Sequence, residues 1–302
     1  MNKILHLKTI SDLYRFLNLG YADHPLLAVV DFSKVMDHVS EEIRIKTDFY
    51  SVMFKNYCRN HIRYGRKTLD FQDGSLVCIA PNHVITIDNQ IDVKEDMLGW
   101  GLFFHPEMIR STSLGNKMKD YTFFSYDITE ALHLSDREQQ LLYDCIVKIQ
   151  VELEQNLDSY SNMLMLSNIE LLLNYCTRFY GRQFITRKAA NMDIVSQVED
   201  SLKYYFEGRG NTNEGLPTVK NLANKVNLSP SYLSDLLKKE TGLNAQDYIH
   251  YYLIEQAKNI LLQTNKSVSE IAYSLGFEYP QYFSRLFKQK TGKTPIEYRS
   301  LN

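Results

Sequence analysis

The pattern of apolar and polar positions divides this chain into two kinds of structure. Between residues 26 and 104, short runs rich in Val, Ile and Phe alternate with turn-forming stretches, and this pattern predicts β-strands. The clearest runs are LLAVVDF (26–32), DFYSVMF (48–54), SLVCIA (75–80) and HVITID (83–88). Several such strands favour a sandwich or a small barrel. From residue 135 onward, apolar residues recur with the period of an amphipathic helix.

Two long helices are expected after the β-rich region, at residues 135–156 and 162–180. The second is apolar on more than one face, whereas the first has a single apolar side formed by Leu141, Leu142, Cys145, Ile149 and Leu153. Such a helical pair docks on the strands, pairs with a second copy of the chain, or does both. A third helix is expected from Asp193 to Phe206, followed by a flexible Gly- and Asn-rich linker at 207–217.

An internal repeat lies near the C-terminus. The segment YLSDLLKKETG (232–242) recurs 50 residues later as YFSRLFKQKTG (282–292), with six of eleven positions identical. Upstream of each segment, LANKVNL (222–228) matches IAYSLGF (271–277) at an offset of 49. The same two-segment unit therefore occurs twice.

Each copy has the signals of two short helices joined by a tight turn. In the second copy, Ser267 and Glu270 form a capping box that starts the first helix. Gly276, and Asn227 in the first copy, stand where this helix ends and φ becomes positive. Pro280 then opens the second helix. A short helix, a left-handed turn and a second helix make a helix-turn-helix motif, so we expect two of them.

The second helix of each motif has a polar side opposite its apolar side. In the second copy, Phe283 and Phe287 define a buried face, and the aromatic residues of this helix are expected in the core. The opposite stripe consists of Gln281, Arg285 and Lys288, flanked by Ser284. The corresponding residues of the first copy are Ser231, Ser234, Asp235, Lys238 and Lys239. We therefore expect two exposed polar helix faces.

These polar side chains are of the kind that contacts DNA in the major groove. Arg pairs bidentately with guanine, Gln does so with adenine, and Lys and Ser reach phosphates. A solvated helix face is the alternative for one such helix, but the repeat favours a binding role. The helix expected between the copies, at 245–263, has 19 residues and would span about 28 Å, close to the roughly 34 Å between successive major grooves. The candidate DNA contacts are Ser231, Ser234, Lys238, Lys239, Gln281, Ser284, Arg285 and Lys288.

Charge is distributed unevenly along the chain, although the net charge is only −2. Residues 217–302 contain 11 Lys and Arg against 7 Asp and Glu, whereas the preceding 216 residues contain 23 against 29. A basic tail on an acidic body indicates an anionic partner for the tail alone.

About the last 90 residues resemble the AraC/XylS family of bacterial transcription regulators. The resemblance is carried by LANKVNLSPSYLSDLLKKETG, SVSEIAYSLGF and YFSRLFKQKTGKTPIEYR, which includes an N-cap, N1 proline and N3 glutamate at Thr294, Pro295 and Glu297. It implies a seven-helix DNA-binding domain with recognition helices near Ser229–Thr241 and Pro280–Thr291. It also implies promoter DNA and RNA polymerase as partners, and dimerisation through the helical pair.

One position departs from the family pattern, because Asp235 stands where members often carry a basic residue. An acidic group there either accepts a hydrogen bond from a cytosine amino group or pairs with a cation of the protein itself. We favour the pair within the protein, since acidic groups rarely contact bases. The role of this position in base recognition is therefore open.

The β-rich region is similar to the cupin-like sensor domain of many AraC-type regulators, through GSLVCIAPNHVI and GWGLFFHPEMI. The resemblance implies a β-barrel that binds a small effector. His61, His83, Arg63 and Trp100 are candidates for lining its pocket, with strand surface or core packing as the alternative for each. The histidines form no HxH pair and have no Glu at matching spacing, so neither a metal nor another cofactor is expected.

Other features bear on compartment and on catalysis. Lys3 and Lys8 interrupt the N-terminal apolar residues, and no apolar run is long enough for a membrane span, so we expect a cytoplasmic protein. The cysteines, Cys58, Cys78, Cys145 and Cys176, form no CxxC pair, which argues against a zinc cluster or disulfides. We expect each to be a small buried hydrophobic residue.

Taken as a whole, the sequence predicts a multi-domain α+β protein that is not an enzyme. The expected parts are a cupin-like β-barrel sensor at 1–130, a dimerising helical hairpin at 131–186, a helix and linker at 187–216, and a double helix-turn-helix domain at 217–302. The expected function is that of a homodimeric, sequence-specific DNA-binding transcriptional regulator that responds to a small molecule. The alternative is a cupin-type metalloenzyme, or a repair enzyme with an acceptor cysteine, that carries a DNA-binding tail.

Overall fold

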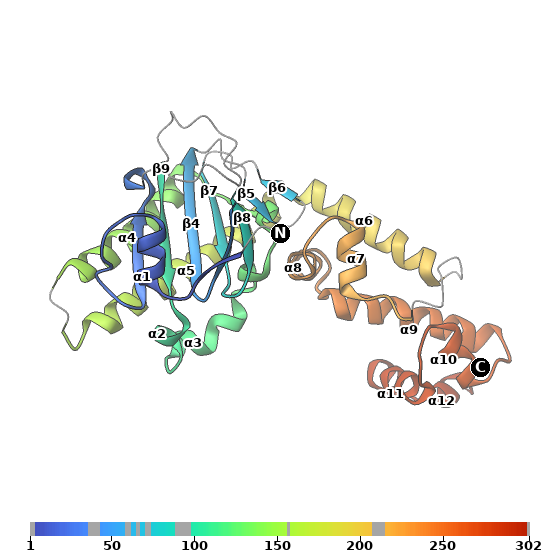
Figure 1. Ribbon diagram of the computed structural model, residues 1–302. Helices are drawn as coiled ribbons and strands as arrows, with labels where there is room; N and C mark the ends of the chain where they lie inside the picture. The colour runs from blue at the N-terminus through green and yellow to red at the C-terminus, as the bar shows by residue number, and fades with distance from the viewer. Residues whose placement is uncertain are drawn as a thin grey trace. The chain divides into compact units, whose positions relative to one another are not determined.

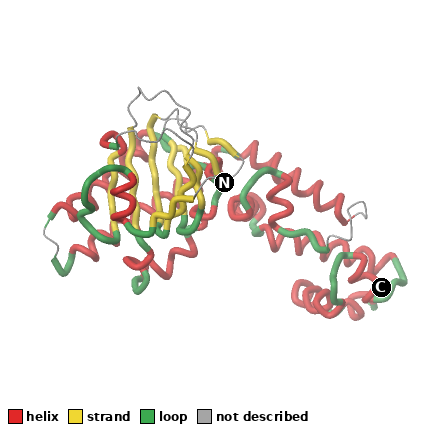
Figure 2. The backbone as a smooth tube through the Cα atoms, viewed as in Figure 1, coloured by secondary structure: helices red, strands yellow, loops and turns green. Residues whose placement is uncertain are grey.

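The computed structural model divides the chain into two compact units, Met1–Thr186 and Arg187–Asn302. It describes residues 4–35, 43–57, 62–64, 67–69, 74–87, 98–155, 158–206 and 215–300. Within these residues, the strands belong to the first unit and the second unit is helical (Figure 2). No helix among them combines the length and apolar character that crossing a membrane requires.

Two five-stranded sheets form the first unit (Figure 1). One sheet has the order β1 (Ile4–Leu7), β3 (Ile43–Thr47), β8 (Val84–Ile87), β5 (Ile62–Tyr64) and β6 (Lys67–Leu69). The other has the order β10 (Leu132–His133), β7 (Ser75–Ile79), β4 (Tyr50–Tyr57), β9 (Leu98–Phe104) and β2 (Leu27–Asp31). Strands β2, β4, β7 and β8 confirm the four expected runs. Among the described strands, none pairs across the two sheets, so these strands form open sheets instead of a closed barrel.

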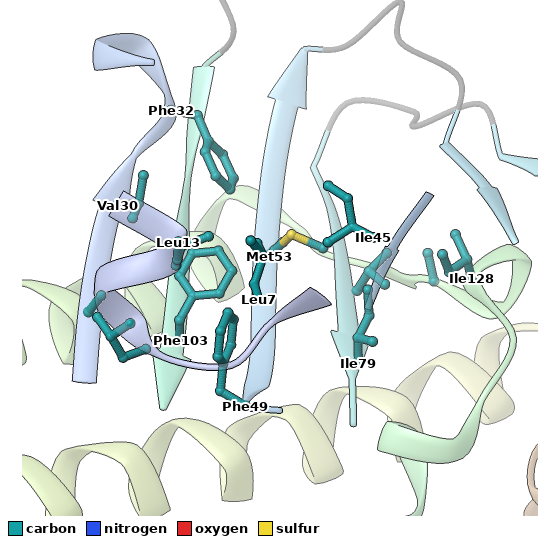
Figure 3. Packing of buried hydrophobic residues seen from close by; sticks show 14 residues of the cluster. Leu7, Leu13, Val30, Phe32, Ile45, Phe49, Met53, Ile79, Phe103 and Ile128 are labelled. Atoms are coloured by element: carbon teal, nitrogen blue, oxygen red, sulfur yellow. The ribbon is translucent and has the colours of Figure 1, made fainter. Parts of the chain in front are cut away.

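One face of the β10–β2 sheet packs against β1, β3 and α1 (Ile10–Phe16) through apolar side chains. Met53 and Phe103 project from this sheet toward Leu7, Leu13 and Ile45, as Figure 3 shows. Together with their neighbours these side chains make a cluster of 14 buried residues. The space between the described strands of the two sheets is therefore a hydrophobic core.

The opposite face of this sheet adjoins a helical hairpin of α4 (Asp136–Glu154) and α5 (Ser161–Thr186), whose existence the sequence predicted. The side-chain amide of Gln183 on α5 pairs with the backbone of edge strand β10: its Oε1 accepts from His133 N at 2.9 Å and its Nε2 donates to Ala131 O at 3.2 Å. This bonding satisfies a sheet edge and attaches α5 to the sheet. Short elements complete the unit, namely η1 (Phe32–Lys34), α2 (Pro106–Ile109), α3 (Ser113–Lys117), η2 (Met118–Asp120), η3 (Thr122–Ser125) and η4 (Ile128–Glu130).

The described part of the second unit contains seven helices, the number that the family resemblance implies. They are α6 (Lys188–Tyr204), α7 (Val219–Lys225), α8 (Pro230–Thr241), α9 (Ala245–Gln263), α10 (Val268–Ser274), α11 (Pro280–Thr291) and α12 (Pro295–Arg299). The expected linker at 207–217 lies mostly outside the described residues.

Helix α6 packs against the first helix-turn-helix. Its Val198 and Leu202 are fully buried. In the first half of α6, Asn191 Nδ2 donates to Glu240 Oε1 at 3.1 Å. In its second half, Glu199 Oε1 accepts from the hydroxyl of Tyr248 at 2.7 Å. These contacts make α6 part of the helical unit.

Candidate nucleic-acid interface

Two helix-turn-helix motifs are present, formed by α7 with α8 and by α10 with α11. Between their helices, Asn227 has a φ of 57° and Gly276 a φ of 91°, which confirms the two expected left-handed turns. The expected capping box at Ser267 and Glu270 is also formed. Backbone and side-chain hydrogen bonds from Ser267 lower the pKa of Glu270, which keeps this cap charged. Local signals in the sequence thus set the start and end of each short helix.

The apolar side of α11 is anchored in the core of the second motif. Phe283 and Phe287 are fully buried, and their ring centroids lie 5.8 Å apart. Phe277 contacts Phe283 at 5.4 Å, and Tyr298 on α12 contacts Phe287 at the same centroid distance. Because this side faces inward, the opposite side of α11 must face solvent.

That exposed side presents Gln281, Arg285 and Lys288, as the helical period predicted, while Ser284 is half-buried. Tyr282 differs from the expectation that the aromatic residues of this helix are core: it is 50% exposed. The Arg285 guanidinium carbon lies 5.3 Å from the centroid of its ring. Tyr282 and Arg285 are three residues apart on a helix, so this cation–π contact could have been found from the sequence.

On α8, the exposed residues of the predicted set are the two lysines, Lys238 and Lys239. Ser231 and Ser234 are half-buried, as is Asp235. The Ser234 hydroxyl accepts a hydrogen bond from the backbone N–H of Ala245, the first residue of α9, at 3.3 Å. Ser234 therefore joins α8 to α9, and the first motif offers DNA a shorter polar surface than the second.

Helix α9 connects the two motifs and has the 19 residues that the sequence predicts. Its first turn is tied to the end of α11, because Lys290 Nζ donates to Asp247 Oδ1 at 2.8 Å. This hydrogen bond and the lysine charge lower the pKa of Asp247. The ion pair joins α11 to the connecting helix α9, so Lys290 pairs within the domain and does not extend the exposed stripe of Arg285.

The four candidate effector residues are not assembled by the part of the chain that the structure describes. His61 lies outside it, and Arg63 lies on β5. Trp100 on β9 is 5% exposed and stacks on Phe54 at 5.8 Å, whereas His83 directly precedes β8 in the other sheet. Burial lowers the pKa of His83.

The described thiols are poor nucleophiles. Cys78, Cys145 and Cys176 are free and buried, and desolvation raises the pKa of both Cys78 and Cys145. Cys58 lies outside the described residues. Within the described ranges, no group of three His, Cys, Asp or Glu side chains is placed to hold a metal ion.

Comparisons with known proteins point to the same region. Residues 222–300 match a family model described as a helix-turn-helix domain. The arabinose operon regulatory protein of Salmonella typhimurium is 29% identical over 141 residues, which is 47% of each chain. The bifunctional transcriptional activator/DNA repair enzyme AdaA of Bacillus subtilis is 36% identical over 85 residues, or 28% of this chain and 40% of that protein.

Among solved structures, the C-terminal domain of the two-component response regulator yesN from Fusobacterium nucleatum is 35% identical and covers 37% of this chain and 98% of that one, with a TM-score of 0.30. This chain spans about half the length, or less, of the two curated relatives named above. Residues 222–300 of this chain thus form a helix-turn-helix domain, in a chain that is similar over part of its length to the transcription regulators named above.

Proposed function

We propose that this chain regulates transcription by placing α8 and α11 in successive major-groove segments of one DNA duplex. The observation that carries the proposal is the division of α11 into two sides. Phe283 and Phe287 are fully buried, while Gln281, Arg285 and Lys288 are all exposed on the other side. A helix held in this way presents its polar side chains to a partner without the cost of ordering its backbone on binding.

Each predicted contact has a chemical role in this proposal. Arg285, held over Tyr282, pairs with a guanine, and Gln281 pairs with an adenine. Lys288 and Ser284 contact the sugar-phosphate backbone beside them. In the first motif, Lys238 and Lys239 bind phosphates, and Ser231 and Ser234 complete that contact at the groove edge. Specificity then resides mainly in α11.

The proposal is tested by selecting duplexes from a random library with the full chain. We expect enrichment of two sequence elements about 10 base pairs apart, since one helical turn separates successive major-groove segments on one side of the duplex. Affinity for the selected duplex should fall steeply as salt concentration rises, because lysines and arginine release counterions from phosphates. Recovery of unrelated sequences after repeated selection would contradict sequence-specific binding.

We assign the first unit to regulation, with a cupin-like sensor at 1–130 and the α4–α5 hairpin at 131–186 as the surface for dimerisation. Support for the hairpin comes from an exposed apolar stripe on α4. Tyr143 is 47%, Val147 38% and Val151 44% exposed, at a spacing of four residues on one side of the helix. Apolar side chains in such a row are covered when a second copy of the helix packs against them.

Val147→Glu is expected to shift the protein from dimer to monomer, because it buries a charge in the proposed interface. Sedimentation velocity measures the change, and Lys148→Glu, at the adjacent exposed position of α4, is the matched control. A wild-type protein that sediments as a monomer at micromolar concentration, or a variant that stays dimeric, would exclude this interface.

The proposal also includes RNA polymerase as a partner at the promoter and the cytoplasm as the location, where the DNA is. The alternative function is that of a DNA repair enzyme, since AdaA is named in part as one. An acceptor cysteine requires an accessible thiolate. The described cysteines are buried, and burial raises the pKa of Cys78 and Cys145, so these observations favour a regulator.

A further inference from the structure

A pocket of about 690 Å³ lies between the β10–β2 sheet and helix α4. Its sheet side includes Phe54 and Trp100, and its helix side includes Gln139, Gln140 and Gln150. The pocket lies on the face of the sheet that is turned away from the core in Figure 3. The strand register shows this. Trp100 pairs with Phe54 and Asp31, so these three side chains lie on one face of the sheet. Phe103 is three residues further along β9 and belongs to the core, so it lies on the opposite face.

The other face of this sheet is packed against the hydrophobic core. There the side chains of the two sheets interdigitate in the cluster of 14 buried residues. Trp100, a candidate for lining an effector pocket, contributes instead to the pocket beside α4, where 5% of its surface remains accessible. A ligand in this pocket would therefore contact the accessible part of Trp100 and the apolar side chains beside it.

The polar wall is held in place by hydrogen bonds within the first unit. Gln140 Nε2 donates to Asp144 Oδ1 at 2.8 Å, and Gln139 Nε2 donates to Leu134 O at 3.2 Å. Asp31 Oδ1 accepts from the Ser33 hydroxyl at 2.7 Å. Side chains fixed in this way lose little rotamer freedom when a ligand binds, which favours a specific site.

The chemistry of the lining restricts the ligand. Carboxylates and glutamine amides accept hydrogen bonds from hydroxyl groups, and the amides donate as well. The lining contains two carboxylates, Asp31 and Asp136, and one lysine, Lys34, so its excess of negative charge disfavours an anion. Phe54, Trp100 and Ile146 supply an apolar base. A neutral molecule with several hydroxyl groups along one side and an apolar opposite side matches both walls.

We propose that this pocket binds a neutral, hydroxyl-rich small molecule with one apolar face, and that it is the effector site of the regulator. The second half of this inference rests on the proposed function. The physical link to that function is Tyr143, which lines the pocket and also begins the exposed apolar stripe continued by Val147 and Val151. An occupied pocket constrains Tyr143 and so changes the surface that α4 presents to a second copy.

Trp100 makes the test direct, because it is the single tryptophan of the chain. The full chain is titrated with D-glucose, D-xylose, ribitol and myo-inositol, and with gluconate as the anionic counterpart, while tryptophan emission is recorded. At least one neutral compound is expected to change the emission saturably, and gluconate is not. The absence of a saturable change with all four neutral compounds, or an equal response to gluconate, would overturn the proposal.

A paired substitution separates this pocket from any other binding place. The double variant Gln140→Ala with Gln150→Ala is expected to weaken binding of the responding compound about tenfold, because it removes two polar partners at the pocket wall. Lys148→Ala, on α4 but outside the pocket lining, should bind like wild type. Both should retain the far-ultraviolet circular dichroism of the parent. Equal affinities for all three proteins would place the site elsewhere.

The same titration, repeated with the selected DNA duplex, distinguishes the two halves of the inference. A change in DNA affinity or in dimer fraction that disappears in the double variant supports the effector role. A saturable change in emission with unchanged DNA affinity and dimer fraction overturns the effector role and leaves a binding pocket. DNA affinity without any compound is measured separately, so failure of the pocket and failure of DNA binding give different results.

Discussion

Replacing Phe283 with alanine is expected to lower the free energy of unfolding of residues 187–302 by about 3–5 kcal/mol. Phe283 is fully buried and contacts both Phe277 and Phe287. Its removal leaves a cavity between α10 and α11 that the surrounding rings fill only in part. Urea unfolding of this fragment, followed by circular dichroism, measures the change.

Tyr282→Ala is the matched control, because it removes a neighbouring aromatic residue of the same helix that is 50% exposed. The loss of its contact with Arg285 should cost less than about 1 kcal/mol of stability. Equal destabilisation by the two substitutions would show that the inward and outward sides of α11 are assigned incorrectly.

Removing α6 is expected to unfold the DNA-binding unit, even though the matched family model begins only at residue 222. A fragment that starts at residue 217 loses Val195, Val198 and Leu202, which are at most 4% exposed. Burial of one such side chain contributes about 1.5–3 kcal/mol, and a whole domain is stable by only about 5–15 kcal/mol. The hydrogen bonds of Asn191 and Glu199 to the first motif are lost as well.

Thermal unfolding of fragments 187–302 and 217–302 compares the two cases. The longer fragment should melt cooperatively, and the shorter one should show no cooperative transition. A shorter fragment with the same melting temperature would mean that α6 only rests on a unit that folds without it.

The helical unit could be predicted closely because its signals are local. Capping residues, Pro280 and the residues of positive φ at Asn227 and Gly276 act within one or two turns of the chain. The repeat then supplied a second copy of each signal. The ion pair between Lys290 and Asp247 depends on how α9 and α11 pack. It could not be predicted, because its partners are 43 residues apart.

The first unit was predicted less completely. The short apolar runs correctly indicated β2, β4, β7 and β8, but β1 and α1 were not singled out. The side of the sheet on which Trp100 lies could not be predicted either. Strand β9 has apolar residues on both faces, so its pattern does not distinguish them. Pairing of the strands decides the matter, and that is a long-range property.

Arg285 is the residue of α11 that we expect to contact a base most specifically. In the full chain, Arg285→Ala is expected to weaken binding to the selected duplex by about 1–3 kcal/mol and to relax the preference at one base pair. Binding to a scrambled duplex of equal length, measured at the same salt concentration, should change much less. An equal loss of affinity for both duplexes would contradict the account, because it would show that Arg285 contacts only phosphate.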